Sequence, residues 1–265
     1  MRVTRPVLLL SVFAFSFLSS AAQQSPSASS PQALKFLKQA LAAISPTTPI
    51  TDVTLSGSAH YIAGSDDETG SATLKAIGSA SRSDLSLSSG PRTEIFNSSG
   101  ASPAGTWTGP DGVAHTMAFH NLLIEPAWFF PAFPIAHGVS SGYLATFVGP
   151  ETRDGQAVDH VTISQTSSVA FPAGLPAMAR LSQMDFFLDS TTFLPAAVTF
   201  NIHPDNNELL DIPIEVRFSD YRPVNGVQVP FHVQEFLNNG LILDLQFTAA
   251  ALNTGLTASQ FQVGQ

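Results

Sequence analysis

Residues 138–142 read Gly-Val-Ser-Ser-Gly, which fits the G-x-S-x-G pattern of a serine hydrolase with Ser140 as its nucleophile. That chemistry needs a sharp turn between a buried strand and a helix, because the turn exposes the serine oxygen. Here a segment broken by prolines precedes the pattern, and the strand-like run GYLATFV follows it. Glycine and serine are abundant in this chain, so a chance match explains the pattern better than a catalytic serine does. We therefore expect no enzyme, and keep a hydrolase that uses Ser140 as the third alternative.

Metal binding would require histidines and carboxylates at ligand spacing. The chain has seven histidines, but none falls in an H-E-x-x-H pattern, and His115 and His120 lie five residues apart. Two acidic turns, at 66–68 and 205–208, lack the spacing of a calcium-binding EF-hand loop. The sequence therefore predicts neither a metal site nor a cofactor.

The charge balance excludes a further class of function. The chain carries 20 acidic and 11 basic residues, for a formal net charge of -9. The first 22 residues hold two of the basic residues and none of the acidic ones, so without them the net charge is 9 minus 20, or -11. Such a surface repels a phosphate backbone, and no basic stripe is interleaved with aromatic residues. We expect no nucleic-acid partner.

The N-terminus has the features of a secretory signal. Arg2 and Arg5 precede an apolar run over residues 7–18, and small residues follow at Ser20 and Ala22. That run spans about 18 Å as a helix, short of the roughly 30 Å hydrocarbon core of a membrane. We expect cleavage after Ala22, a periplasmic or secreted location, and a mature chain without a transmembrane segment. No cysteine is present, so the mature chain has no disulfide and no thiol that could carry a lipid.

The rest of the chain divides into a short tether and one domain. Residues 23–32 (QQSPSASSPQ) read as a flexible tether, and residues 33–265 as a single domain that we expect to be a monomer. Residues 33–44 have apolar side chains at helical spacing, and Pro46 stops this amphipathic helix. From Thr51 onward the apolar period changes to two, in short segments that Gly, Ser, Asp and Pro separate. This is typical of antiparallel strands joined by tight turns.

The last three of these strands show the clearest alternation of apolar and polar residues. An Asn-Gly turn at 225–226 separates the first two strands. Their large apolar side chains point to one face, which far exceeds the few hundred Å² that soluble monomers leave exposed, so something must cover it. These side chains are Ile212, Ile214, Val216, Phe218, Val227, Val229, Phe231, Val233, Leu241, Leu243, Leu245 and Phe247.

The available covers are apolar segments cut by prolines, at 119–138 and 169–181, together with the N-terminal helix. They are too short and irregular to fill the whole face, so the pattern suggests an apolar cavity with a short helical or loop lid. A core filled by these same segments fits the pattern equally well. The predicted cavity lining is Val216, Phe218, Val229, Phe231, Val233, Leu243 and Leu245. The predicted lid is Trp128, Phe129, Phe130 and Phe133.

The C-terminal third carries a motif on the strands described above. The motif consists of Asp220-Tyr221 at the end of a strand, the turn Val224-Asn225-Gly226, Pro230 inside the next strand, and a closing Asn253 with Phe261. With the order of elements over residues 31–263, this resembles the LolA/LolB-like family of periplasmic lipoprotein carriers, which includes the outer-membrane lipoprotein-sorting proteins.

The resemblance implies a mainly β fold, a curved antiparallel and unclosed half-barrel of about ten or eleven strands, with an N-terminal amphipathic helix and short apolar covers. It implies a non-catalytic carrier or binder of lipid or of lipoprotein acyl chains, with an envelope protein as donor or acceptor. An envelope sensor or interaction domain with a filled core is the alternative. Family members tie the lid with an early-strand arginine, and neither Arg82 nor Arg92 is matched to that position.

Overall fold

The computed structural model describes residues 28–98, 103–166 and 175–263, so the predicted signal and its cleavage site after Ala22 lie outside the described residues. The described helices are α1 (Pro31–Ile44), η1 (Phe119–Leu123), α2 (Ala132–Gly138), α3 (Leu175–Leu181) and η2 (Ala258–Phe261), of which η1 and η2 are 3-10 helices. The described strands are β1 (Asp52–Ala63), β2 (Asp66–Ile77), β3 (Ala80–Leu87), β4 (Gly90–Asn97), β5 (Ala104–Thr108), β6 (Ala114–Thr116), β7 (Tyr143–Arg153), β8 (Gln156–Gln165), β9 (Met184–Asp189), β10 (Pro195–Ile202), β11 (Ile212–Val224), β12 (Val227–Leu237) and β13 (Gly240–Leu252).

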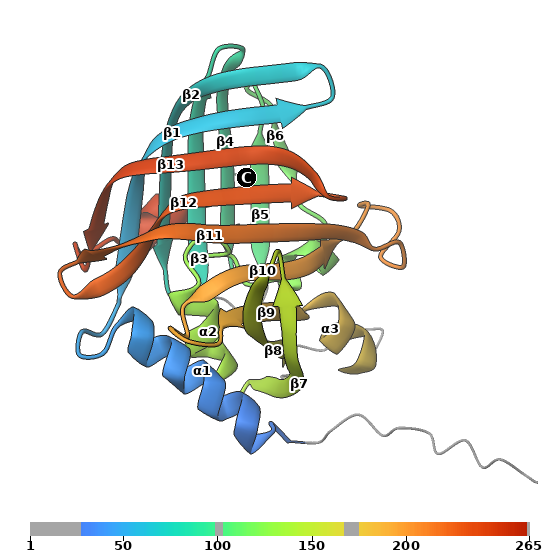
Figure 1. Ribbon diagram of the computed structural model, residues 1–265. Coiled ribbons are helices and arrows are strands. Elements are labelled where there is room, and N and C mark those ends of the chain that lie inside the picture. The colour runs from blue at the N-terminus through green and yellow to red at the C-terminus, as the bar shows by residue number, and fades with distance from the viewer. Residues whose placement is uncertain (1–27, 99–102, 167–174, 264–265) are drawn as a thin grey trace, which may run out of the picture.

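These strands form one antiparallel sheet in the order β6-β5-β4-β3-β2-β1-β13-β12-β11-β10-β9-β8-β7. The N-terminal hairpins join the C-terminal ones where β1 pairs with β13. The edge strands β6 and β7 do not pair with each other, so the curved sheet in Figure 1 stays open. This confirms the unclosed half-barrel that the family resemblance implied. Its 13 strands exceed the ten or eleven expected, because the short β5 and β6 extend one edge.

Tight turns fix the register of the C-terminal hairpins. Asn225 and Gly226, between β11 and β12, have φ of 49° and 83°, and Asn238 and Asn239, between β12 and β13, have φ of 49° and 65°. Glycine and asparagine tolerate this left-handed region best, and such turns match the twist of the strands they join. The register then places alternate residues of three neighbouring strands on the same face.

The alternation predicted for β11, β12 and β13 is confirmed. Ten of the twelve apolar side chains expected on one face are buried, and Ile212 and Leu241 are partly exposed. The ten buried side chains form one hydrophobic core with α1, the 119–138 segment and the inward residues of the other strands. Full burial of such a side chain contributes roughly 1.5–3 kcal/mol, so this concave face is a main source of stability.

Helix α1 begins earlier than the expected residue 33. Ser30 is its N-cap, since the Ser30 side chain accepts a hydrogen bond of 3.0 Å from the backbone N–H of Ala33, and Pro31 lies in the first turn. The hydroxyl of Ser29 accepts a 3.0 Å hydrogen bond from the backbone of β7. Residues 29–32 of the predicted tether therefore belong to the folded domain.

The α-helices cover only part of the concave face. α1 contacts α2 and strands β7, β8 and β12, and it buries Leu37 and Ile44. α2 packs against β7 and α3 against β8, and none of the three α-helices has β2, β3 or β4 among its main neighbours in the described residues. No α-helix of the described residues therefore lies over the β2–β4 half of the sheet. None of the described helices has both the length and the apolar content to cross a bilayer.

The chain is fastened near its C-terminal end to the start of β1. Asp52 is buried, and its carboxylate accepts hydrogen bonds from the backbone N–H groups of Thr254 (2.8 Å) and Gly255 (3.0 Å). Burial alone would raise the pKa of Asp52, but these hydrogen bonds hold it below its ordinary value. The side chain of Asn253 accepts a 2.7 Å hydrogen bond from the backbone of Thr51. Asn253, part of the family motif, thus has a structural role.

Candidate ligand-binding cavity

Two adjacent cavities lie within the half-barrel. The first has a volume of about 300 Å³ and is lined by strands β1–β5, β12 and β13 and by Trp128. The second, of about 250 Å³, extends toward η1 and β10 and is bordered by Phe96, Ile124 and Phe200. Each is near the lower end of the ~300–1,000 Å³ range of small-molecule sites.

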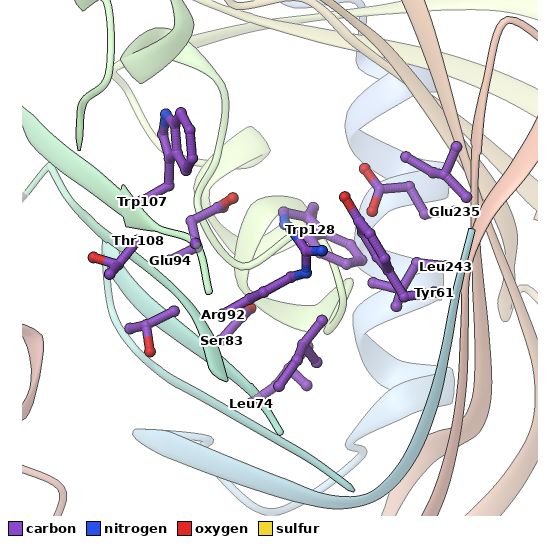
Figure 2. Close-up of a pocket in the computed structure, with 14 residues that line it drawn as sticks. Tyr61, Leu74, Ser83, Arg92, Glu94, Trp107, Thr108, Trp128, Glu235 and Leu243 are labelled. Atoms are coloured by element: carbon purple, nitrogen blue, oxygen red, sulfur yellow. The ribbon is translucent and has the colours of Figure 1, made fainter. Parts of the chain in front are cut away.

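Four side chains border both cavities, namely Glu94, Trp107, Trp128 and Glu235. We call this group the cavity waist. Figure 2 shows Glu94 and Trp107 on one side, Glu235 on the other, and Trp128 between them. Trp107 is 45% exposed and stacks on His115 with ring centroids 4.1 Å apart. A ligand that filled both cavities would pass between two indole rings and two carboxyl groups.

Strand alternation turns both carboxyl groups of the waist inward. Glu235 is the next inward position of β12 after Val233, and it lies opposite Leu243 of β13. Glu94 of β4 lies opposite Trp107 of β5 in the same way. Neither carboxyl group was among the predicted site residues, because those were chosen from the apolar side chains of the strands. Continuing the alternation of β12 by one step beyond Val233 predicts that Glu235 also points inward.

The seven predicted lining residues are divided between cavity and packed core. Leu243 borders the first cavity, and its neighbour Ile242 does so too, because a β-bulge between Glu235 and Phe236 disturbs the alternation there. Neither of the two cavities touches the other six, which belong to the hydrophobic core and are at most 7% exposed. These six are Val216, Phe218, Val229, Phe231, Val233 and Leu245. The first cavity thus lies mainly over β1–β5, and which side chains contact a ligand stays a prediction.

Of the four predicted lid residues, Trp128 borders both cavities. Phe129, Phe130 and Phe133 are buried in the hydrophobic core. Trp128 is partly exposed and meets Phe129 edge-on, with ring centroids 5.6 Å apart. Three rings therefore anchor the segment while one faces the open space, and movement of the segment on ligand binding stays a prediction.

The two carboxyl groups of the waist have no hydrogen-bond partner among the described residues. Solvent reaches Glu94, yet this side chain lies deep enough in the half-barrel for burial to raise its pKa. Burial, and then the charge of Glu94, raise the pKa of Glu235 to about 8. The two groups therefore act as a coupled pair that holds at least one proton at neutral pH.

The cation in the cavity wall already has partners. Nη2 of Arg92 lies 3.3 Å from Glu68 and 3.4 Å from Asp66, and the guanidinium covers the ring of Tyr61 at 4.6 Å. Hydrogen bonds from Ser89 lower the pKa of Glu68 to about 2, so this carboxylate is ionised. Arg92 therefore does not neutralise the waist.

A buried carboxylate fastens the 119–138 segment to the sheet. Glu125 contacts Nδ1 of His137 at 2.6 Å and accepts a hydrogen bond from the hydroxyl of Tyr143, which begins β7. The hydrogen bond to Glu125 raises the pKa of His137. Neither Arg82 nor Arg92 is hydrogen-bonded to residues 119–138 in the described part of the chain. Glu125 and Tyr143 therefore join this segment to the start of β7, and Gln165 of β8 also holds it through the carbonyl of Leu123.

Ser140 does not complete a nucleophilic site. It lies between the end of α2 and the start of β7, and its backbone N–H donates to the carbonyl of His137 at 2.8 Å. Nδ1 of His137 is engaged by Glu125, and no hydrogen bond joins this ring to the Ser140 hydroxyl in the described residues. The strand–turn–helix setting of a nucleophile elbow is missing at Ser140. The described residues also contain no group of three His, Asp or Glu side chains placed to hold a metal ion.

No protein-family model and no curated protein matches the chain, whereas several solved structures do. A domain from Vibrio parahaemolyticus described as an outer membrane lipoprotein-sorting protein superposes with a TM-score of 0.54 at 13% identity, over 87% of this chain and 96% of that chain. A LolA superfamily protein from Nitrosomonas europaea gives 0.52 at 11% identity, over 87% and 97%. A DUF1329 family protein from Desulfovibrio piger gives 0.52 at 10% identity, also over 87% and 97%.

These matches span nearly the whole of each related structure, at identities that establish architecture and leave function open. The C-terminal motif pointed to the same architecture. The chain therefore has the fold of the LolA superfamily.

Proposed function

We propose that this chain is a non-catalytic periplasmic carrier or binder of lipid or of lipoprotein acyl chains. The observation that carries the proposal is the pair of adjacent cavities inside the half-barrel, which Leu74, Leu85, Leu243 and Ile124 help to line. Each methylene group of an alkyl chain contributes about 0.8 kcal/mol when it is buried. A chain of about ten methylene groups would then gain roughly 8 kcal/mol before the costs of association.

Two further points support the proposal. One structure with this fold is described as an outer membrane lipoprotein-sorting protein, so the architecture is compatible with that role. The N-terminal sequence has the pattern of an export signal with cleavage after Ala22, which would bring the chain to the compartment where such cargo travels. The ligand would be a lipid or an acylated lipoprotein, and an envelope protein would deliver or receive it.

A second candidate is an envelope sensor or interaction domain on the same fold. It is favoured by the packing of Val216, Val229 and Val233, which are fully buried by protein atoms. In that case the C-terminal half of the concave face is an ordinary core, and the remaining cavities are too small or too polar to hold a chain. The two candidates differ in whether the purified protein binds an apolar probe.

The test is a titration with a fluorescent long-chain acyl probe and its displacement by unlabelled lipid. Leu243→Glu places a carboxylate in the wall of the first cavity, where it would have to be desolvated beside a bound chain, so affinity should fall by at least about tenfold. Leu209→Glu is the matched control, because Leu209 is 80% exposed and borders neither cavity. A wild type that binds no probe, or a Leu243→Glu variant that folds and binds normally, would overturn the proposal.

A further inference from the structure

We propose that the cavity waist selects an amphiphile whose head group is a primary or quaternary ammonium. The inference rests on the proposed binding of an apolar chain and names the chemical class of its head. It comes from the four side chains that border both cavities: two carboxyl groups and two indole rings. A cavity built only for hydrocarbon would not place carboxyl groups there, because burying them costs free energy.

The composition of the waist is suited to an organic cation. Aromatic faces attract ammonium groups through the ring quadrupole, and tryptophan does so most strongly. Trp107 and Trp128 border both cavities, and Figure 2 shows them beside the Glu94 side chain. Glu94 and Glu235 approach from opposite arms of the sheet, so a cation between them would face a carboxyl group on each side.

The other ionisable groups around the cavities do not satisfy the pair. Arg92 is paired with Glu68, and its guanidinium lies over Tyr61. Glu125 is engaged by His137 and Tyr143. Asp205, on an exposed loop at the edge of the second cavity, and His115, stacked on Trp107, are the remaining ionisable groups nearby. Glu94 and Glu235 thus lack a neutralising partner, which a bound ammonium group would supply.

The pair also sets the direction of the pH dependence. An ammonium group binds the ionised carboxylates best, so its affinity should rise as the pH is raised through about 8, the pKa of Glu235 in the free protein. A neutral head group gains nothing from the negative charge that appears when Glu235 ionises and must be bound beside it, so its affinity should fall over the same range. Opposite slopes for two ligands with the same chain are difficult to explain by a general change in folding.

The experiment compares three ligands of equal chain length, a dodecyltrimethylammonium salt, dodecanol and dodecanoate, by calorimetry below their micelle concentrations. At pH about 8 the ammonium ligand should bind wild type about tenfold or more tightly than the alcohol, the size expected of a quaternary cation held against an indole face at a partly desolvated site. Binding should also release protons from the waist, seen as a heat that depends on the buffer.

The Glu94→Gln/Glu235→Gln variant should bind the three ligands with similar affinity. Glu208→Gln is the control, because it removes an exposed carboxylate outside both cavities, and it should keep the preference for the ammonium ligand. The double substitution removes charge repulsion, so folding should survive it, and circular dichroism checks this. The single Glu235→Gln change, with an intermediate preference expected, serves if the double variant fails to fold. Equal affinity of wild type for the ammonium and alcohol ligands, or a preference that survives in the double variant, would overturn the inference and leave chain binding intact. If no ligand binds, the proposed function fails with it.

Discussion

The Glu235→Gln substitution tests whether burial in the cavity waist raises the pKa of Glu235. Burial raises the pKa of Glu235 from 4.5 to about 8, so the folded chain holds a proton that the unfolded chain releases. The free energy of unfolding should therefore fall as the pH rises from about 4.5 to about 8, and then level off. Glutamine has nearly the same shape and does not ionise, so the variant lacks this dependence.

The rise of the Glu235 pKa from 4.5 to about 8 could change the free energy of unfolding by at most about 5 kcal/mol. The cavity is open to water and Glu235 is only partly buried by its neighbours, so screening reduces this to about 1–3 kcal/mol. We expect Glu235→Gln to be more stable than wild type by that amount at pH about 9, and equally stable at pH about 5.

The assay is urea unfolding of wild type, Glu235→Gln and Glu208→Gln at several pH values. Glu208 is exposed, so its variant controls for the loss of one negative charge at the surface. A difference between wild type and Glu235→Gln that stays constant with pH would refute the assignment of a raised pKa to this residue. It would also remove one support of the inference about the head group.

Three further predictions follow from the packing. Leu245→Ala should lose about 3–5 kcal/mol of unfolding free energy, since Leu245 is fully buried in the core. Leu243→Ala should lose only about 1–2 kcal/mol, because Leu243 already borders open space, and equal losses in urea unfolding would contradict this division. Asp52→Ala should cost about 2 kcal/mol of unfolding free energy at pH about 7, because two backbone donors lose a buried acceptor. The cost should shrink as the pH falls below 3.8, where the unfolded wild-type chain takes up a proton that the native carboxylate, with its lowered pKa, takes up only at lower pH; a pH-independent cost would argue against the hydrogen-bonded carboxylate. In a Trp107→Phe background, the fluorescence of Trp128 should shift to shorter wavelength when a long-chain lipid binds, and an unchanged spectrum at saturation would exclude Trp128 from the ligand site.

Much of the fold could be predicted because local patterns and tertiary structure agree. The alternation in β11, β12 and β13 defined a buried face, and the Asn225-Gly226 turn fixed the register between the first two of these strands. The start of α1 could have been predicted as well, since Ser30 followed by Pro31 is a standard helix N-terminus.

The candidate site could be predicted only in part. The alternation of β12 alone puts Glu235 on the inner face, although a prediction based on apolar residues does not include it. The alternation does not say which part of the inner face the covers fill. That depends on how α1 and the 119–138 segment pack, and this packing buries Leu245 fully while Leu243 borders open space. Trp128 and Phe129 are neighbours in an irregular segment, so no periodicity distinguishes the ring that faces the cavity from the buried one.

The central claim is that the half-barrel holds an apolar chain, and native mass spectrometry of the protein purified from its own host tests it most directly. We expect wild type to carry a dissociable adduct with the mass of a lipid, and Leu243→Glu, purified in the same way, to carry none. Leu209→Glu should keep the adduct. Wild-type protein that is free of any adduct and also fails to take up added lipid would contradict the account.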